Sequence, residues 1–322
     1  MIQYFSKRFS ASMLLIWGVL TITFFLMHLA PGDPSLIYLD PNIDPKVVEN
    51  IQEQMGLNSP VYIQYFSWLK QFLAGNFGIS FMHKRPVVDL LRETIPNTLQ
   101  LTFVVFILQF VFGILIGVIC AVNRHSKLDT SIDSFLVFLY SVPGFWLALM
   151  AIRIFSIDLG WLPSSQMQSI TIGDGFAVLL LDRIKHLVLP VMVLTLPFSA
   201  YTARFVRGSF AEILQQDYIR TVRAYGIKKS KILFKYALKN ALLPLITLSG
   251  LYLPFLLGGA VITEYVFSWP GMGRVTIEAI FAYDYPLILA SASIAAISVI
   301  FGNLLSDLLY TAFDPRIKLR TA

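Results

Sequence analysis

Residues 217–243 read DYIRTVRAYGIKKSKILFKYALKNALL, the longest strongly basic stretch in a chain that is otherwise largely apolar. Asp217 suits the N-cap of a helix, and Gly226 suits the left-handed residue that follows a helix end. The stretch therefore predicts a short helix over Tyr218 to Tyr225, with a sharp turn after it. We expect this segment to be a cytoplasmic docking loop.

A second helix is predicted to start near Ile227 or Ser230 and to continue into the next apolar run. Lys231, Lys235 and Lys239 are spaced by four residues, so they would share one face of that helix. A basic face of this kind suits the boundary of lipid headgroups.

The composition indicates an integral membrane protein. Of 322 residues, 56% are hydrophobic and only 14% are charged, whereas soluble domains carry about 25% charged residues. The net charge of +6 could suggest nucleic acid, but the basic residues lie between apolar segments, where they are expected to anchor the cytoplasmic side. The single cysteine, Cys120, excludes an intrachain disulfide and a cysteine-based metal cluster, and is expected to be a buried small hydrophobe.

Apolar runs near the length of a membrane span predict an all-α polytopic protein with six transmembrane helices. A kink is expected in the third span at Pro143-Gly144, and the fourth span contains Pro190 and Pro197. The predicted spans are Ser10–Ala30, Thr98–Val122, about Ser134–Ile152, Leu187–Ala203, Ala241–Thr263 and Leu287–Leu309.

Most of the 25 Lys and Arg residues fall on the cytoplasmic side if both termini lie inside, which favours that orientation. Residues 31–96 would then form a small extracytoplasmic subdomain, with amphipathic helices at Val47–Met55 and Val61–Leu73. Ser156 to His186 would be an outer loop holding a short amphipathic piece around Phe176 to Ile184.

The motifs that support catalysis are missing from the sequence. It contains no phosphate-binding loop of the Gly-x-x-x-x-Gly-Lys-Ser/Thr form, no His-Glu-x-x-His pair and no Gly-x-Ser-x-Gly elbow. A membrane-bound enzyme that uses the first outer loop is therefore disfavoured.

Polar residues near the membrane are the candidates for a transport pathway or gate. Asn303 and Asp307 are four residues apart on the last span and could line a polar path or bond to a neighbouring helix. Arg153 and Glu264 fall at the outer boundary, where Arg153 could also snorkel to the surface. Pro143, where the third span is expected to kink, is a further candidate for the pathway or gate.

The basic stretch resembles the ATPase-coupling loop of the membrane permeases of bacterial ABC importers, in the form found in the dipeptide, oligopeptide and nickel branch. Arg220, Thr221 and Val222 stand where the general importer pattern has Glu-Ala-Ala, while Gly226 and Leu238 match it. The resemblance assigns coupling to Asp217, Tyr218, Arg220, Thr221, Arg223, Ala224, Tyr225, Gly226 and Leu238.

Landmarks similar to those of that branch run along nearly the whole chain. They are Ala30–Pro34, Leu57–Tyr65, Gly75–Ser80, Pro96–Leu99, Ser141–Pro143, Glu264–Gly273 and Asp314–Arg316. The long first outer loop resembles that of the B-type subunit of a permease pair.

The resemblance implies a type I ABC importer fold in the bacterial cytoplasmic (inner) membrane. Its expected partners are a second homologous permease, two ATPase subunits that bind ATP and Mg, and an extracytoplasmic solute-binding protein. No cofactor and no catalytic site are expected in this chain. The implied division is residues 1–30, 31–96, 97–312 with the coupling loop at 204–240, and a tail at 313–322.

The solute stays open between a dipeptide, a longer peptide, a nickel or other metal chelate and a heme-like cargo. A stand-alone channel or secondary transporter is the alternative from another class. A secondary transporter would be expected to show inverted repeats and an ion site at mid-membrane, and the sequence shows neither.

Overall fold

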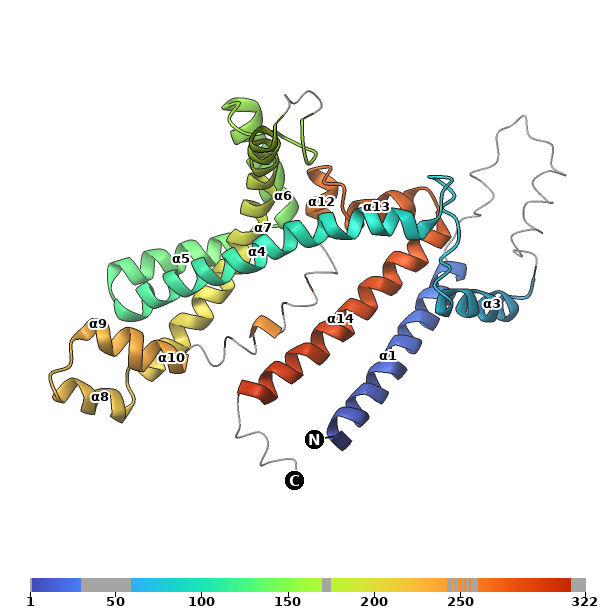
Figure 1. Cartoon of the computed structure of the whole chain (residues 1–322). Coiled ribbons are helices and arrows are strands. Elements are labelled where there is room, and N and C mark those ends of the chain that lie inside the picture. Colours follow the sequence, from blue (N-terminus) through green and yellow to red (C-terminus); the bar gives the residue numbers. More distant parts are fainter. Residues whose placement is uncertain are drawn as a thin grey trace. The chain divides into compact units, whose positions relative to one another are not determined.

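The structure is a computed structural model, and it describes residues 2–29, 59–169, 175–241, 245, 248–250, 252, 255 and 260–313. Within these residues the regular structure is helical, apart from one isolated bridge between Ile79 and Pro86. Figure 1 shows the helices in chain order. They are α1 (Ile2–Leu29), α3 (Val61–Leu73), α4 (Val87–Val122), α5 (Lys127–Ser141), α6 (Gly144–Ala151), η2 (Ile152–Asp158), α7 (Phe176–Ile213), α8 (Asp217–Ala224), α9 (Lys229–Lys231), η3 (Ile232–Ala237), α10 (Leu238–Ala241), α12 (Val261–Val266), α13 (Met272–Phe281) and α14 (Tyr285–Phe313).

Three of the described helices are long and apolar enough to cross a membrane, over Arg8–Leu29, Val87–Val122 and Tyr285–Leu305. A fourth span results if α5 and the segment Gly144–Asp158 are counted as one bent helix. Most of the predicted fifth span, Ala241–Thr263, lies outside the described residues, as does Val47–Met55. The count of six spans therefore stays a prediction.

The chain divides into two compact units, and each is described by itself. Within the described residues, the first unit comprises residues 1–98, 257–261 and 270–300, and the second comprises the remainder.

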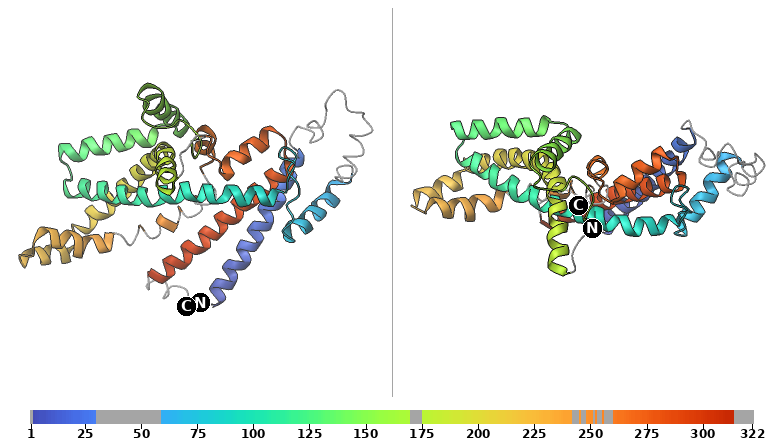
Figure 2. Two further views of the ribbon diagram at one scale, coloured as in Figure 1. Left: turned by 45° about the horizontal axis from the view of Figure 1, so that its top comes forward. Right: turned by 90° about the horizontal axis from the view of Figure 1, so that it is seen from above.

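In the first unit, α1 and α14 lie side by side in Figures 1 and 2. Phe24 of α1, Tyr65 of α3 and Leu289 of α14 are buried in one cluster. The rings of Phe24 and Tyr65 meet edge to face with their centroids 5.3 Å apart. The aromatic side chains thus fix the predicted helix Val61–Leu73, whose bounds the structure confirms, against the first span.

Two landmarks that are far apart in the sequence meet in the first unit. Asn97 donates its side-chain amide to the carbonyl oxygen of Pro270 at 2.9 Å. The backbone N–H of Met272 donates to the hydroxyl of Thr98 at 2.8 Å. These bonds fix the turn before α13 against α4 and give buried polar groups their partners.

In the second unit, α4 and α7 pack at very short range. A Cβ added at Gly113 would lie 2.6 Å from the side chain of Thr202, and one at Gly117 would lie 2.6 Å from the carbonyl oxygen of Ala203. The two glycines are four residues apart and so lie on one face of α4. Small residues at this spacing let membrane helices approach closely.

The break at Pro143-Gly144 is confirmed and is larger than a proline kink. Pro143 stands directly before α6, and the axes of α5 and the following segment differ by 99°. α6 then packs on α7 through Ala148, Ala151, Leu189 and Val193.

The expected outer loop Ser156–His186 is wrong in its second half. Phe176 to Ile184 is not a separate amphipathic piece but the start of α7, which contains the predicted fourth span within 38 helical residues. No helix breaker separates Ile184 from Leu187, so the helix continues through both segments. Pro190 and Pro197 lie inside it, as membrane helices tolerate. Likewise, the helix of the predicted second span begins at Val87, before Thr98.

Candidate functional site

The short helix of the basic stretch is α8, and it begins one residue earlier than predicted. Gln216 is the N-cap and makes no capping bond with its side chain. The prediction of Asp217 as N-cap is therefore wrong. Asp217 is the first helical residue, where its carboxylate accepts a bond from Arg220 at 3.4 Å and still favours the positive helix end.

Gly226 ends α8 as predicted. Its φ is +71°, in the left-handed region that a side chain disfavours. Its N–H donates to the carbonyl oxygen of Arg223 at 3.0 Å, and the N–H of Tyr225 donates to that of Thr221 at 3.1 Å. Figure 1 shows α8 and the α9 to α10 segment as two arms on either side of this turn.

One fully buried side chain of α8 packs into the rest of the second unit. The side chain of Ile219 is fully buried in a cluster with Phe210 and Ala211 of α7, Ala121 of α4, and Ile232, Ala237 and Ala241 of the second arm. Val222, three residues further along, is half-buried against the same cluster. Positions three apart share a face, so α8 has one narrow inward edge.

The predicted coupling residues of α8 lie around the remaining, outward surface. Tyr218 and Tyr225 are exposed, the latter by 81%. The other exposed members are Asp217, Arg220, Thr221, Arg223, Ala224 and Gly226. Leu238 differs from them, because it is half-buried against the cluster that holds Ile219. The structure thus separates eight surface residues from one supporting residue.

The second arm starts within the predicted region but is not a uniform α-helix. Its middle, η3, is π-helical. Lys231 and Lys235 are both exposed, but a π-helical turn between them shifts the four-residue register on which the predicted basic stripe depended. The amide of Asn240 donates to the hydroxyl of Tyr218 at 2.9 Å and ties this arm to α8.

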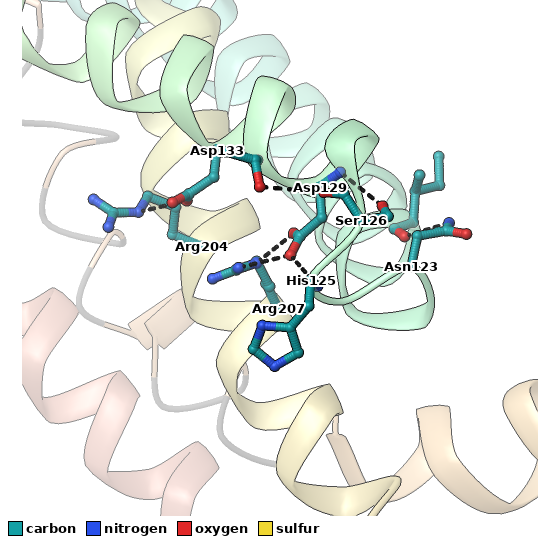
Figure 3. A network of polar contacts seen from close by, with 9 residues as sticks. Asn123, His125, Ser126, Asp129, Asp133, Arg204 and Arg207 are labelled. Atoms are coloured by element: carbon teal, nitrogen blue, oxygen red, sulfur yellow. Dashed lines mark hydrogen bonds and ion pairs between the residues drawn. The ribbon is translucent and has the colours of Figure 1, made fainter.

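A network of charged residues joins α5 and α7 in the same unit (Figure 3). Arg207 of α7 donates two bonds to the carboxylate of Asp129 on α5, at 2.7 and 2.8 Å. Arg204 pairs with Asp133 at 3.1 Å. The Asp129 side chain is only 2% exposed. We call these four residues the ionic clamp.

The turn between α4 and α5 is built to present Asp129. Ser126 caps α5 by accepting a bond from the N–H of Asp129 at 3.1 Å. The N–H of His125, whose φ is +66°, donates to the Asp129 carboxylate at 3.0 Å. The sequence pattern does not reveal this network, because the distribution of Lys and Arg residues says nothing about which acids Arg204 and Arg207 meet.

Comparison with known proteins decides the family. Residues 113–319 match the family described as binding-protein-dependent transport system inner membrane component, and residues 1–102 match its N-terminal region. The chain belongs to this family. It is a membrane permease component of an ABC-type importer, and ATP hydrolysis lies in a separate subunit of such systems.

Relatives of the permease match it from end to end. The oligopeptide transport system permease protein AppB of Bacillus subtilis (strain 168) is 40% identical over 99% of this chain and all of its own length. The glutathione transport system permease protein GsiC of Escherichia coli (strain K12) is 35% identical over 99% of both chains.

A solved structure shares the fold of the permease. It is the MetNI methionine ABC transporter in an inward-facing conformation, with a TM-score of 0.57 and 21% identity. The match covers 70% of this chain and 97% of the solved one.

The predicted pathway residues of the permease lie apart from α8 in the sequence and in different environments. Pro143 is at the α5–α6 break, and Arg153 in η2 pairs with Asp158 at 3.0 Å on the surface. Glu264 lies in α12 and is fully buried. Asn303 is exposed on α14, and Asp307 is on the same helix, with its side chain outside the described part. The structure does not bring these five residues together in one described site.

Proposed function

We propose that this permease is one of two homologous membrane subunits of a peptide importer, and that α8 receives the motion of an ATPase subunit. The observation that carries the proposal is the build of α8: a short helix with exposed charged and aromatic residues, held by the single buried side chain of Ile219. A partner protein can bind the exposed surface of such a helix, and a displacement of the helix would be transmitted to the elements that pack against Ile219.

Peptide as the solute class is supported by the relatives. AppB is named for oligopeptide and GsiC for glutathione, which is itself a tripeptide, and both match over their full length. A nickel or other metal chelate is the alternative solute, and neither of these relatives is named for it.

The remaining subunits follow from the family. Two ATPase subunits would bind ATP and Mg, a second permease would complete the path, and an extracytoplasmic binding protein would deliver the solute. The proposed location is the bacterial cytoplasmic membrane, with six spans, both termini inside and transport inward. The basic residues Arg220, Arg223, Lys228, Lys229 and Lys231 support this orientation for α8 and the turn and helix that follow it.

Purification and uptake test the proposal. The permease, carrying an affinity tag, should co-purify from native membranes with an ATPase and a second permease. Cells that lack its gene should lose uptake of labelled glutathione or a labelled tetrapeptide but keep uptake of ⁶³Ni²⁺. Transport by the isolated chain in vesicles without ATP would contradict the assignment as a subunit of an ATP-driven importer. Loss of nickel uptake with unchanged peptide uptake would show that the solute is a metal ion or chelate and not a peptide.

A further inference from the structure

We propose that the ionic clamp makes α5 move together with α8, so that Asp129 and Arg207 are positioning residues for transport. The inference rests on the proposed function, because it concerns what happens to motion that enters at α8. It adds that this motion is passed to α5, and therefore to the break at Pro143.

The spacing of the clamp gives it two rungs. Asp129 and Asp133 are one turn apart on α5, and Arg204 and Arg207 are about one turn apart on α7. Asp129 pairs with Arg207 and Asp133 with Arg204, at 2.7 and 3.1 Å. A single pair could act as a pivot. The Asp133–Arg204 contact is an ion pair without a hydrogen bond at Asp133 Oδ1, so it adds an attraction one turn away that opposes sliding of one helix against the other.

The Asp129–Arg207 pair has a fixed geometry. Both carboxylate oxygens of Asp129 accept bonds from the planar guanidinium of Arg207, and one also accepts the N–H of His125. A bidentate arginine pair fixes direction as well as distance. The acceptor is buried, so separating the pair would leave a charge without water.

Apolar contacts also join α7 to α5 on one side of the clamp and to α8 on the other. Leu136 and Leu139 of α5 are buried against Ala200 and Ala203 of α7. In the other direction, Phe210 and Ala211, just beyond Arg207 on α7, are in the cluster that holds Ile219 of α8. A continuous chain of contacts therefore runs from α8 through the end of α7 to α5.

The test measures one distance within the permease in its complex with the ATPases, reconstituted in nanodiscs. The single cysteine, Cys120, is replaced by Ala, and spin labels are placed at Phe138 on α5 and Phe234 on η3, which are both exposed. Their distance distribution is recorded by pulsed EPR without nucleotide and after trapping with ATP and vanadate.

With the clamp intact we expect one narrow distribution that is the same in both states. Arg207→Gln should broaden it and make it shift on trapping, and Arg207→Lys should give a smaller broadening. If Arg207→Gln prevents assembly, Arg204→Gln removes the more exposed rung and should broaden the distribution to an intermediate width. The matched control is Arg92→Gln, which breaks an exposed pair with Asp89 outside the clamp and should change nothing.

The proposal is overturned if the variant that assembles keeps the original distribution in both states. A shift of the intact chain on trapping, or equal broadening by Arg92→Gln, would also overturn it. Co-purification of the ATPases is scored separately in each sample. Loss of the ATPases from the intact chain would contradict the docking role of α8, while the distribution without nucleotide would still report on the clamp.

Discussion

Gly226 is required for its backbone conformation and not for space. A Cβ at this position would meet nothing within 4 Å, yet φ is +71°. Gly226→Val should therefore disfavour the observed turn by about 1–2 kcal/mol or more, which corresponds to at least a several-fold loss of the correctly turned α8. We expect weaker association with the ATPase subunit, measured by the amount of ATPase that co-purifies, with unchanged membrane insertion.

Two further variants distinguish the effect of the positive φ at Gly226 from the effect of the added side-chain volume. Gly226→Asn should keep most of the association, because asparagine tolerates the left-handed region. Gly208→Val on α7 places the same side chain in equally open space but without a positive φ, and should have little effect. Equal losses from Gly226→Val and Gly208→Val would show that the turn is not the cause.

Ile219 should determine how firmly α8 is seated. Its side chain is fully buried, and removing most of it leaves a cavity beneath the helix. Ile219→Ala in a core costs about 2–5 kcal/mol, and here the cost should appear as local opening of α8. Hydrogen exchange of the α8 amides should become faster by 10-fold or more, whereas Tyr225→Ala, which removes an exposed ring, should leave exchange unchanged. Unchanged exchange in Ile219→Ala would mean that other contacts hold the helix.

Among the helices, the crossing of α4 and α7 should be the most sensitive to added volume. A Cβ at Gly113 or Gly117 would lie 2.6 Å from atoms of α7, including the backbone oxygen of Ala203. Either glycine changed to Ala should force the helices apart and cost about 1–3 kcal/mol. The thermal midpoint of the purified permease in detergent should fall, while Gly18→Ala on α1, where space is open, should not lower it. A midpoint unchanged by both substitutions would mean that the helices separate without cost.

Features of the local sequence predict several helices and their ends, but they do not predict which residues of different helices come into contact. Val61–Leu73, the end of the helix at Gly226 and the break at Pro143 each follow from nearby residues, since periodicity, a glycine and a proline act on their own segment. The sequence does not predict that α7 begins at Phe176, because Asp182, Arg183 and Lys185 interrupt the apolar run, whereas the helix continues through them.

The clamp could not be predicted in this way, because Asp129 and Arg207 are 78 residues apart. The spacing of the two acids by four residues and of the two arginines by three is compatible with pairing between two helices. Only the packing of α5 on α7 decides which acid meets which arginine. For the same reason, the motif predicts α8 as a docking helix, while the half-buried position of Leu238 is known only from the structure.

At the scale of the whole chain, residues about 200 positions apart in the sequence are joined in the first unit by buried polar contacts. The carboxylate of Asp284, just before α14, accepts hydrogen bonds from the hydroxyl of Ser80 at 2.5 Å and from the N–H of Met82 at 3.1 Å. Its other oxygen accepts the N–H of Leu287 at 3.4 Å. Asp284 and Ser80 are both fully buried, so one carboxylate both caps α14 and holds a loop 204 residues earlier in the chain.

Asp284→Asn should break this link with almost no change in volume. Asp284 uses both oxygens as acceptors, and an amide supplies only one acceptor, so either orientation of Asn places its NH₂ against a donor. A buried donor left without a partner costs about 1–3 kcal/mol. The amides of Met82 and Leu287 should then exchange with solvent at least several-fold faster, whereas Asp89→Asn, at an exposed acid of the same unit, should leave them unchanged. If both amides keep their protection in Asp284→Asn, the loop and α14 are held by apolar packing through Leu287 and Ile288 instead, because these side chains belong to the buried core of the same unit.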